Sequence, residues 1–179
     1  MKIFISGGCK NGKSTFAQTL AKDLAADGRP LYYVATMEPH DDEDSARIAR
    51  HLREREGWGF ETVEQPTDLC AILERTDPEG SYLFDSVTAL VANEMFRSDG
   101  SFDKNAGERV AKDILKFLDS VEHAVLVSDY IYSDAALYDE MVEDYRRALA
   151  LCDHTAAKAC DKVFEVTAAQ VICHKGEMS

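Results

Sequence analysis

The chain has 179 residues, of which 45% are hydrophobic and 30% charged, which are ordinary values for a globular protein with a substantial core. Its net charge of −13 excludes a general nucleic-acid or anionic-membrane binder, because both classes need a basic surface. A nucleotide pocket is still compatible, since it needs only local positive charge. No apolar run approaches the roughly 18 residues that span a bilayer, and the glycine-rich start MKIFISGG does not resemble a signal peptide, so we expect a cytoplasmic protein without a membrane span.

Short apolar runs alternate with helical stretches along the first half of the chain. Residues 2–6 predict a buried strand, and residues 13–28 predict a helix with Phe16, Leu20 and Leu24 on one face. The other elements expected up to residue 96 are strands at 30–36, 60–64 and 81–85, and helices at 42–55, 67–75 and from 86 to about 96.

The second half continues the alternation. We expect a loop at 97–107, a helix at 108–119, a strand at 124–129 and helical structure over 134–159, where Leu137, Met141, Tyr145, Leu149 and Cys152 have helical spacing. The segments KVFEV (162–166) and QVICH (170–174) predict a closing hairpin. Strand–helix alternation implies a mainly parallel sheet with helices on both faces, and ligands bind at the carboxyl ends of the strands in such folds.

The segment GGCKNGKS (7–14) fits the phosphate-binding pattern G-x-x-x-x-G-K-[ST]. It follows a predicted strand and opens a predicted helix, which is the context that the motif requires. Glycines let the backbone N–H groups turn inward, the lysine reaches the β- and γ-phosphates, and the hydroxyl binds Mg²⁺. The residues expected to hold the nucleotide here are Gly7, Gly8, Cys9, Lys10, Asn11, Gly12, Lys13 and Ser14. We therefore predict a single P-loop NTPase-like (RecA-like) α/β domain over residues 1–179, with a C-terminal hairpin.

A P-loop enzyme also needs a carboxylate at the end of another strand, to hold Mg²⁺ or its waters. Asp85 ends SYLFD and Asp129 ends AVLVSD. Aspartate at a strand–helix junction also serves as a helix N-cap, so either residue has a purely structural alternative. We favour Asp85, together with Ser14, as the metal ligands.

His51 lies in the helical stretch ARIARHLRER between Arg47 and Arg55, with a spacing of four residues. Residues four apart lie on one slowly turning stripe of a helix. The periodicity alone favours a solvated surface histidine. The flanking cations disfavour protonation of the imidazole, and a neutral imidazole beside bound phosphates would be a competent nucleophile.

Several motifs in this order and spacing resemble one known family. They are the P-loop, YYVATMEPHDDEDSARIARHLRER, FETVEQP and LFDSVTALVANEMF. The chain looks like a member of the bifunctional adenosylcobinamide kinase and adenosylcobinamide-phosphate guanylyltransferase family of cobalamin biosynthesis. The resemblance covers most of the chain and is densest over residues 1–96.

The resemblance implies two reactions. A nucleoside triphosphate, ATP or GTP, phosphorylates the hydroxyl of adenosylcobinamide, and GTP then gives its GMP to a histidine, which passes it to adenosylcobinamide phosphate. The histidine maps to His51, so the implied catalytic residues are His51 and Lys13. The further residues implied at the nucleotide site are Ala35, Thr36, Met37, Arg47, Leu52, Arg53, Glu54, Arg55, Glu64 and Asp85. The implied cofactor is Mg²⁺, the implied partner is the corrinoid substrate, and the implied assembly is a homo-oligomer such as a trimer.

Two other functions fit the residues. One is a P-loop kinase of another small alcohol, in which His51 only contacts phosphate. The other is a nucleotide-binding regulatory protein without turnover. Covalent GMP on the protein would distinguish the first function from the bifunctional enzyme, and nucleotide binding without product release would support the second.

Overall fold

One sheet of seven strands organises the part of the chain that the structure, a computed structural model, describes: residues 1–25, 28–38, 48–49, 52–53, 55–132 and 134–177. The strand order is β3-β2-β4-β5-β1-β6-β7. All neighbouring pairs are parallel except β6 and β7. The bounds are β1 Lys2–Gly7, β2 Leu31–Ala35, β3 Glu61–Glu64, β4 Ser81–Asp85, β5 His123–Asp129, β6 Lys162–Thr167 and β7 Gln170–Lys175.

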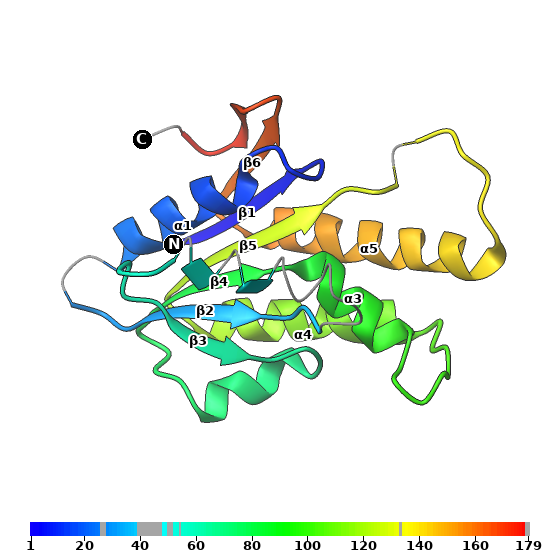
Figure 1. Cartoon of the computed structure of the whole chain (residues 1–179), viewed down its shortest axis with the longest axis horizontal. Helices are drawn as coiled ribbons and strands as arrows, with labels where there is room; N and C mark the ends of the chain where they lie inside the picture. The colour runs from blue at the N-terminus through cyan, green and yellow to red at the C-terminus, as the bar shows by residue number, and fades with distance from the viewer. Residues whose placement is uncertain (26–27, 39–47, 50–51, 54, 133, 178–179) are drawn as a thin grey trace.

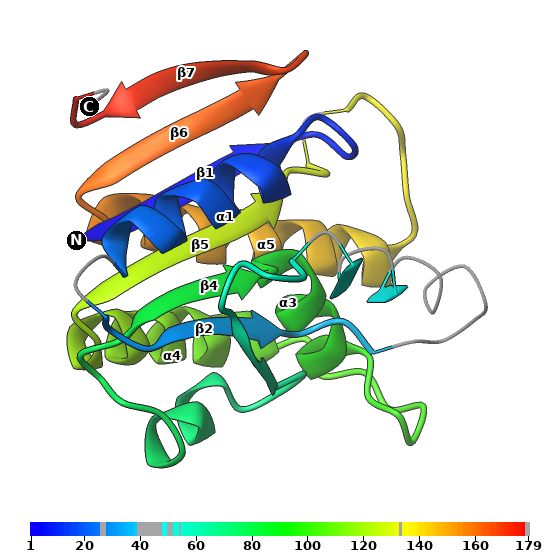
Figure 2. The same cartoon turned by 60° about the vertical axis from the view of Figure 1, so that its left-hand side comes forward.

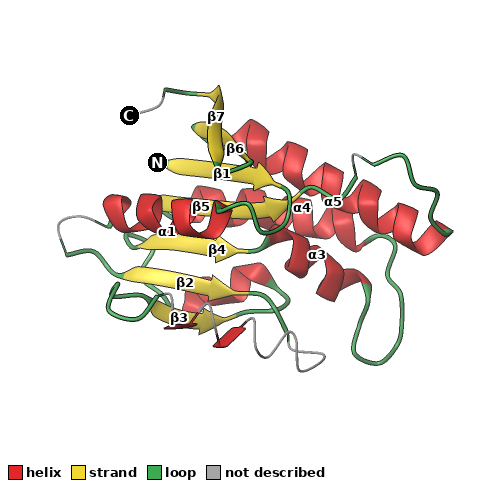
Figure 3. Ribbon diagram, turned by 45° about the horizontal axis from the view of Figure 1, so that its top comes forward, coloured by secondary structure: helices red, strands yellow, loops and turns green. Residues whose placement is uncertain are grey.

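Helices cover both faces of this sheet (Figures 1 to 3). The helix α1 lies on one face, and α3, α4 and α5 lie on the other. Their bounds are α1 Lys13–Leu24, α3 Val87–Met95, α4 Ala106–Ser120 and α5 Glu140–Ala159, with a 3₁₀ helix η1 at Leu69–Glu74. The predicted fold class is confirmed, since the sheet is mainly parallel, carries helices on both faces and ends in the antiparallel β6–β7 hairpin.

Alternation along the buried strands divides the core into two layers. In β1, Ile3 and Ile5 pack on the α1 side with Ala17 and Ala21. Phe4 points to the opposite side, into the larger cluster formed with α3, α4 and α5. Because the central strands are buried on both faces, they read in the sequence as continuous apolar runs.

Three described elements differ from the prediction in type or by more than two residues at one end. The helix α1 ends at Leu24 and not at residue 28. The helix predicted at 67–75 is the shorter 3₁₀ helix η1, Leu69–Glu74. The long helix α5 begins at Glu140, because Asp139 caps it by accepting a hydrogen bond from the Val142 backbone N–H at 2.9 Å. Leu137, which we placed on the apolar face of this helix, precedes it and is 99% exposed.

The strand β6 fixes the hairpin to the rest of the molecule by pairing with β1 along its length. Lys175 at the end of β7 donates hydrogen bonds to the carbonyl of Lys158 in the last turn of α5, at 2.9 Å, and to that of Cys160 just after the helix, at 2.5 Å. Such cations suit the negative end of a helix. The predicted charged helix 42–55 lies mostly outside the described residues. None of the described helices is both long and apolar enough to cross a membrane.

Candidate functional site

The P-loop follows β1 at the carboxyl edge of the sheet and leads into α1 (Figure 1). Gly7 packs so closely on β6 that a Cβ there would collide with the Val166 carbonyl oxygen. Gly12 has a φ of 94°, a left-handed conformation that favours glycine, directly before the first turn of α1. Asn11 donates a side-chain hydrogen bond to the same Val166 carbonyl. Both fixed glycines of the motif therefore have a backbone reason to be glycine.

Lys13 is the buried cation of this loop, with 6% of its side chain exposed. Its Nζ donates to the Gly8 carbonyl at 2.6 Å and forms an ion pair with Asp129 Oδ1 at 2.6 Å. Asp129 ends β5, the strand next to β1, so the pairing of these strands brings the two groups together. Lys10 and Cys9 are exposed, and Ser14 is half-buried in the first turn of α1.

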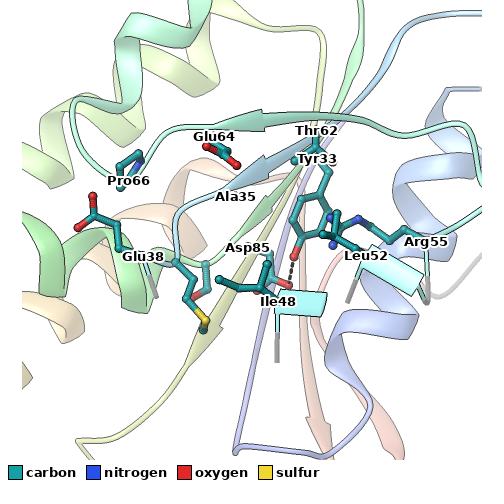
Figure 4. Close-up of a pocket in the computed structure, with 12 residues that line it drawn as sticks. Tyr33, Ala35, Glu38, Ile48, Leu52, Arg55, Thr62, Glu64, Pro66 and Asp85 are labelled. Atoms are coloured by element: carbon teal, nitrogen blue, oxygen red, sulfur yellow. Dashed lines mark hydrogen bonds between the residues drawn. The ribbon is translucent and has the colours of Figure 1, made fainter. Parts of the chain in front are cut away.

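A cavity of about 430 Å³ opens at the same edge, beyond the ends of β2, β3 and β4 (Figure 4). Six residues predicted for the nucleotide site line it: Ala35, Met37, Leu52, Arg55, Glu64 and Asp85. Tyr33, Glu38, Ile48, Thr62, Pro66 and Ser86 complete the lining. Segments that are far apart in the sequence thus come together around this cavity.

Arg55, Tyr33 and Asp85 form a connected group in this cavity (Figure 4). The Arg55 guanidinium carbon lies 3.4 Å from the centre of the Tyr33 ring, a stacked cation–π geometry. The Tyr33 hydroxyl donates to Asp85 Oδ2 at 2.9 Å. Arg55 is 6% exposed, and its Nη1 has no hydrogen-bond partner among the described residues. A buried guanidinium with an unused donor is suited to bind an anionic oxygen.

Thr36 is fully buried, although we placed it at the nucleotide. Its hydroxyl donates to the Ser86 carbonyl at 2.9 Å and accepts from the Ser86 N–H at 2.7 Å. Asn93 donates to the Thr36 carbonyl at 2.7 Å. These contacts join the end of β2 to the start of α3, so the geometry of Thr36 fits a structural role beside the cavity.

Arg47, His51 and Glu54 lie outside the described residues, so the predicted histidine stripe has no described geometry. Leu52 and Arg53 are helical and exposed, and Leu52 lines the cavity. The role of His51 stays a prediction from the sequence.

The residues at this edge fit a magnesium ion bound with a nucleotide. Mg²⁺ prefers oxygen ligands and uses few protein groups, because phosphates and waters complete its octahedral shell. Ser14 supplies a hydroxyl oxygen, while Asp85 is half-buried, lines the cavity and has one carboxylate oxygen held by Tyr33. Asp129, the alternative carboxylate, is engaged by Lys13.

The sequence analysis missed Tyr33. The sequence could have predicted it as a site residue, because Tyr33 lies two residues before Ala35 and the alternation of a strand puts both side chains on one face of β2. A tyrosine among aliphatic strand residues brings a polar tip that needs a partner when it is buried.

Comparison with known proteins identifies relatives over the whole chain. The family model described as cobinamide kinase / cobinamide phosphate guanyltransferase (CobU) matches residues 3–172. The bifunctional adenosylcobalamin biosynthesis protein CobP of Pseudomonas aeruginosa is 30% identical over 180 residues, which cover 99% of both chains. The protein of the same description named CobU in Salmonella typhimurium is 26% identical and is matched over 95% of its length. The CobU of Escherichia coli is 34% identical over 105 residues, a match that spans about half of each chain, 58% of this one and 55% of the other.

Solved structures share the fold at low sequence identity. One solved ATPase domain superimposes with a TM-score of 0.51 at 14% identity, over 91% of this chain and 68% of its own. A DnaB-like replicative helicase superimposes with a TM-score of 0.52 at 12% identity, over 92% of this chain and 46% of its own. These likenesses show the P-loop ATPase fold alone. The family model and the full-length relatives show more, namely that this chain belongs to the cobinamide kinase / cobinamide phosphate guanyltransferase family.

Proposed function

We propose that this chain phosphorylates adenosylcobinamide and then transfers GMP from GTP to adenosylcobinamide phosphate, giving adenosyl-GDP-cobinamide. One observation carries the proposal beyond family membership. The P-loop with Lys13 and the cavity with Arg55 and Asp85 open at the same carboxyl edge of the sheet, where ligands bind in this class of fold.

In the kinase step, the hydroxyl oxygen of the corrinoid attacks the γ-phosphorus of ATP or GTP. The bond from this phosphorus to the bridging oxygen breaks, and the nucleoside diphosphate leaves. Lys13 and the P-loop N–H groups would hold the β- and γ-phosphates, and their positive potential would stabilise the charge on the transferring group. Bound Mg²⁺ would neutralise phosphate charge, with Ser14 and Asp85 as its protein ligands.

In the guanylyl transfer, a neutral His51 nitrogen attacks the α-phosphorus of GTP and pyrophosphate leaves. A phosphate oxygen of adenosylcobinamide phosphate then attacks the same phosphorus, and the phosphorus–nitrogen bond breaks to restore the histidine. Arg55 supports this step, because its buried guanidinium has a donor that no described residue uses, and the residue lines the cavity. Arginine suits phosphate oxygens because its N–H groups form a planar fork.

Two measurements on the full chain test the proposal. The protein is incubated with labelled GTP and Mg²⁺, and its intact mass is compared before and after. It is then given adenosylcobinamide with ATP, and the corrinoid products are separated. We expect a covalent GMP adduct and successive phosphorylated and guanylylated corrinoids. Phosphorylation without an adduct would favour a P-loop kinase alone, and nucleotide binding without any product would favour a regulatory protein.

We also propose that the enzyme is a homo-oligomer such as a trimer, as the family resemblance implies. Light scattering on the purified protein measures its mass directly, and a monomer would contradict this part of the proposal.

A further inference from the structure

A second cavity is lined by residues of β1, β6, β7 and α5 and of the segment after β5. It lies on the face of the sheet that α5 covers, and Figure 2 shows that α1 lies on the other face. Its volume is about 610 Å³. Polar or aromatic side chains provide much of its lining, including Tyr130, Tyr132, Asp153, Glu165 and His174. None of the described residues that line it is a lysine or an arginine. The lining therefore offers hydrogen-bond acceptors and ring faces, and it does not favour an anion.

Asp153 of α5 is the unusual group in this cavity, because it is a carboxyl residue only 3% exposed. Its Oδ2 accepts a hydrogen bond from the Tyr132 hydroxyl at 2.9 Å. No hydrogen bond of normal geometry reaches Oδ1 from the described residues. Burial raises the pKa of Asp153 to about 7, which outweighs the opposite effect of the Ser128 and Tyr132 hydroxyls. A buried acceptor that receives no hydrogen bond lowers the stability of the folded state. A donor group of a ligand would satisfy Oδ1, so this atom is a candidate ligand-binding atom.

The Glu165 carboxylate adds further hydrogen-bond acceptors to the lining of the cavity. Glu165 of β6 receives the Tyr130 hydroxyl on Oε1 at 3.3 Å, and its Oε2 lies 2.8 Å from His174 Nε2. The Tyr130 and Tyr132 rings offer flat apolar surface beside these oxygens. Such a combination suits a neutral ligand with N–H donors on an apolar frame.

This cavity also adjoins the P-loop. Ser6, which lines it, directly precedes Gly7, and Tyr130 directly follows Asp129, the partner of Lys13. A ligand held here would therefore border the phosphate-binding loop from the other side of β1 and β5. That is a suitable position for a large acceptor whose hydroxyl must reach the phosphates.

We propose that this cavity binds one edge of the corrinoid acceptor, with Asp153 Oδ1 accepting an N–H from a primary amide on the rim of the macrocycle. The inference rests on the proposed function, because the corrinoid is its substrate. The volume accommodates amide side chains and part of the ring edge, while the rest of the ligand lies outside the cavity.

The test measures adenosylcobinamide binding by equilibrium dialysis, followed by its visible absorption, and GTP binding to the same protein by calorimetry. Asp153→Ala removes the acceptor, and we expect about tenfold weaker corrinoid binding, the usual effect of a lost buried hydrogen bond. GTP affinity should stay unchanged. Asp144→Asn is the matched control, since Asp144 is also on α5 but pairs with Arg147 outside the cavity, and this variant should bind both ligands like wild type.

A second variant keeps the test decisive if Asp153→Ala does not fold. Ala157 lines the cavity on α5, and Ala157→Phe should fill it without removing a hydrogen bond of Asp153. We expect this variant also to lose corrinoid affinity and to keep GTP affinity. If either folded variant binds corrinoid like wild type, this inference is wrong and the proposed function stands. If the wild-type protein binds GTP but neither binds nor phosphorylates the corrinoid, the proposed function itself fails.

Discussion

The Lys13 ammonium and the Asp129 carboxylate lie 2.6 Å apart, and this ion pair joins the P-loop to the end of the neighbouring strand β5. The pair fixes a cation where the β- and γ-phosphates of a nucleotide would lie. The two candidate metal-binding carboxylates also differ in their partners, because Asp129 pairs with Lys13 whereas Asp85 accepts a hydrogen bond from Tyr33.

Lys13→Ala should abolish both the kinase and the GMP-transfer activity, because we propose that one phosphate site serves both reactions. We expect losses on the order of 100-fold or more, the usual effect of removing one group that stabilises the transition state. Corrinoid phosphorylation and GMP labelling are measured in parallel. Lys22→Ala, on the exposed side of the same helix, is the control. Kinase activity of Lys13→Ala near the wild-type level would refute the shared site.

Asp85→Asn should raise the Mg²⁺ concentration needed for half-maximal turnover more than Asp129→Asn does. The first change removes the carboxylate that we propose as a metal ligand, whereas the second removes the partner of Lys13. Turnover is titrated with Mg²⁺ at saturating nucleotide for both variants. The opposite order of the two midpoints would assign the metal to Asp129.

His51→Asn should remove GMP labelling and spare corrinoid phosphorylation, since direct transfer in the P-loop needs no covalent histidine. Asparagine keeps a polar side chain but cannot form the phosphoramidate. The wild-type adduct should be labile in acid and stable in alkali, because protonation of the phosphoramidate nitrogen makes it a leaving group. Equal labelling of the variant would return His51 to the alternative of a solvated surface histidine.

Tyr33→Phe should keep the stack under Arg55 and lose the hydrogen bond to Asp85. We expect about fivefold weaker Mg²⁺-dependent turnover, as one hydrogen bond contributes ~1 kcal/mol. Tyr33→Leu loses both contacts and should also weaken GTP binding. If the two variants behave alike in both assays, the ring does not position Arg55.

Asp153→Asn should change how stability depends on pH. The folded carboxyl has a pKa of about 7 against an ordinary value of 3.8, so between these values the folded state holds a proton that the unfolded state has released. Stability from this group is therefore lost as pH rises from about 4 to about 7, by at most about 4 kcal/mol. Urea unfolding at pH 5 and pH 8 measures the effect. We expect the wild type to lose more free energy of unfolding than the variant across this range. Parallel pH dependence would show that Asp153 ionises normally, even beside Asp129 and Tyr132.

Local patterns predicted much of the fold, because the evidence for each element lies within it. The P-loop, the buried strands and the closing hairpin all have short-range signals. The predicted start of α5 was wrong because apolar residues keep the helical spacing on the N-terminal side of the Asp139 cap. The cap decides where the helix starts, since it satisfies backbone N–H groups that the apolar pattern ignores.

The relations between elements were harder to predict. The ion pair of Lys13 with Asp129 depends on β5 lying next to β1, and the sequence does not state the strand order. The stack of Arg55 on Tyr33 likewise depends on which segments pack together, and so does the oxygen of Asp153 that has no partner among the described residues. Residue types could suggest these groups as candidates, but only tertiary packing brings them into contact.

The strand order also has a consequence for how the protein is made. Among the described strands, β1 leaves the ribosome first, and it pairs with β5 and β6, which both follow residue 122 in the chain. Asn11 of the P-loop likewise needs the Val166 carbonyl. During synthesis the phosphate-binding loop therefore stays without its two flanking strands until most of the chain has emerged. A nascent chain of this protein acquires its β2–β3–β4 half early and its phosphate-binding loop late, so a nonsense mutation before β6 would leave that loop unsupported.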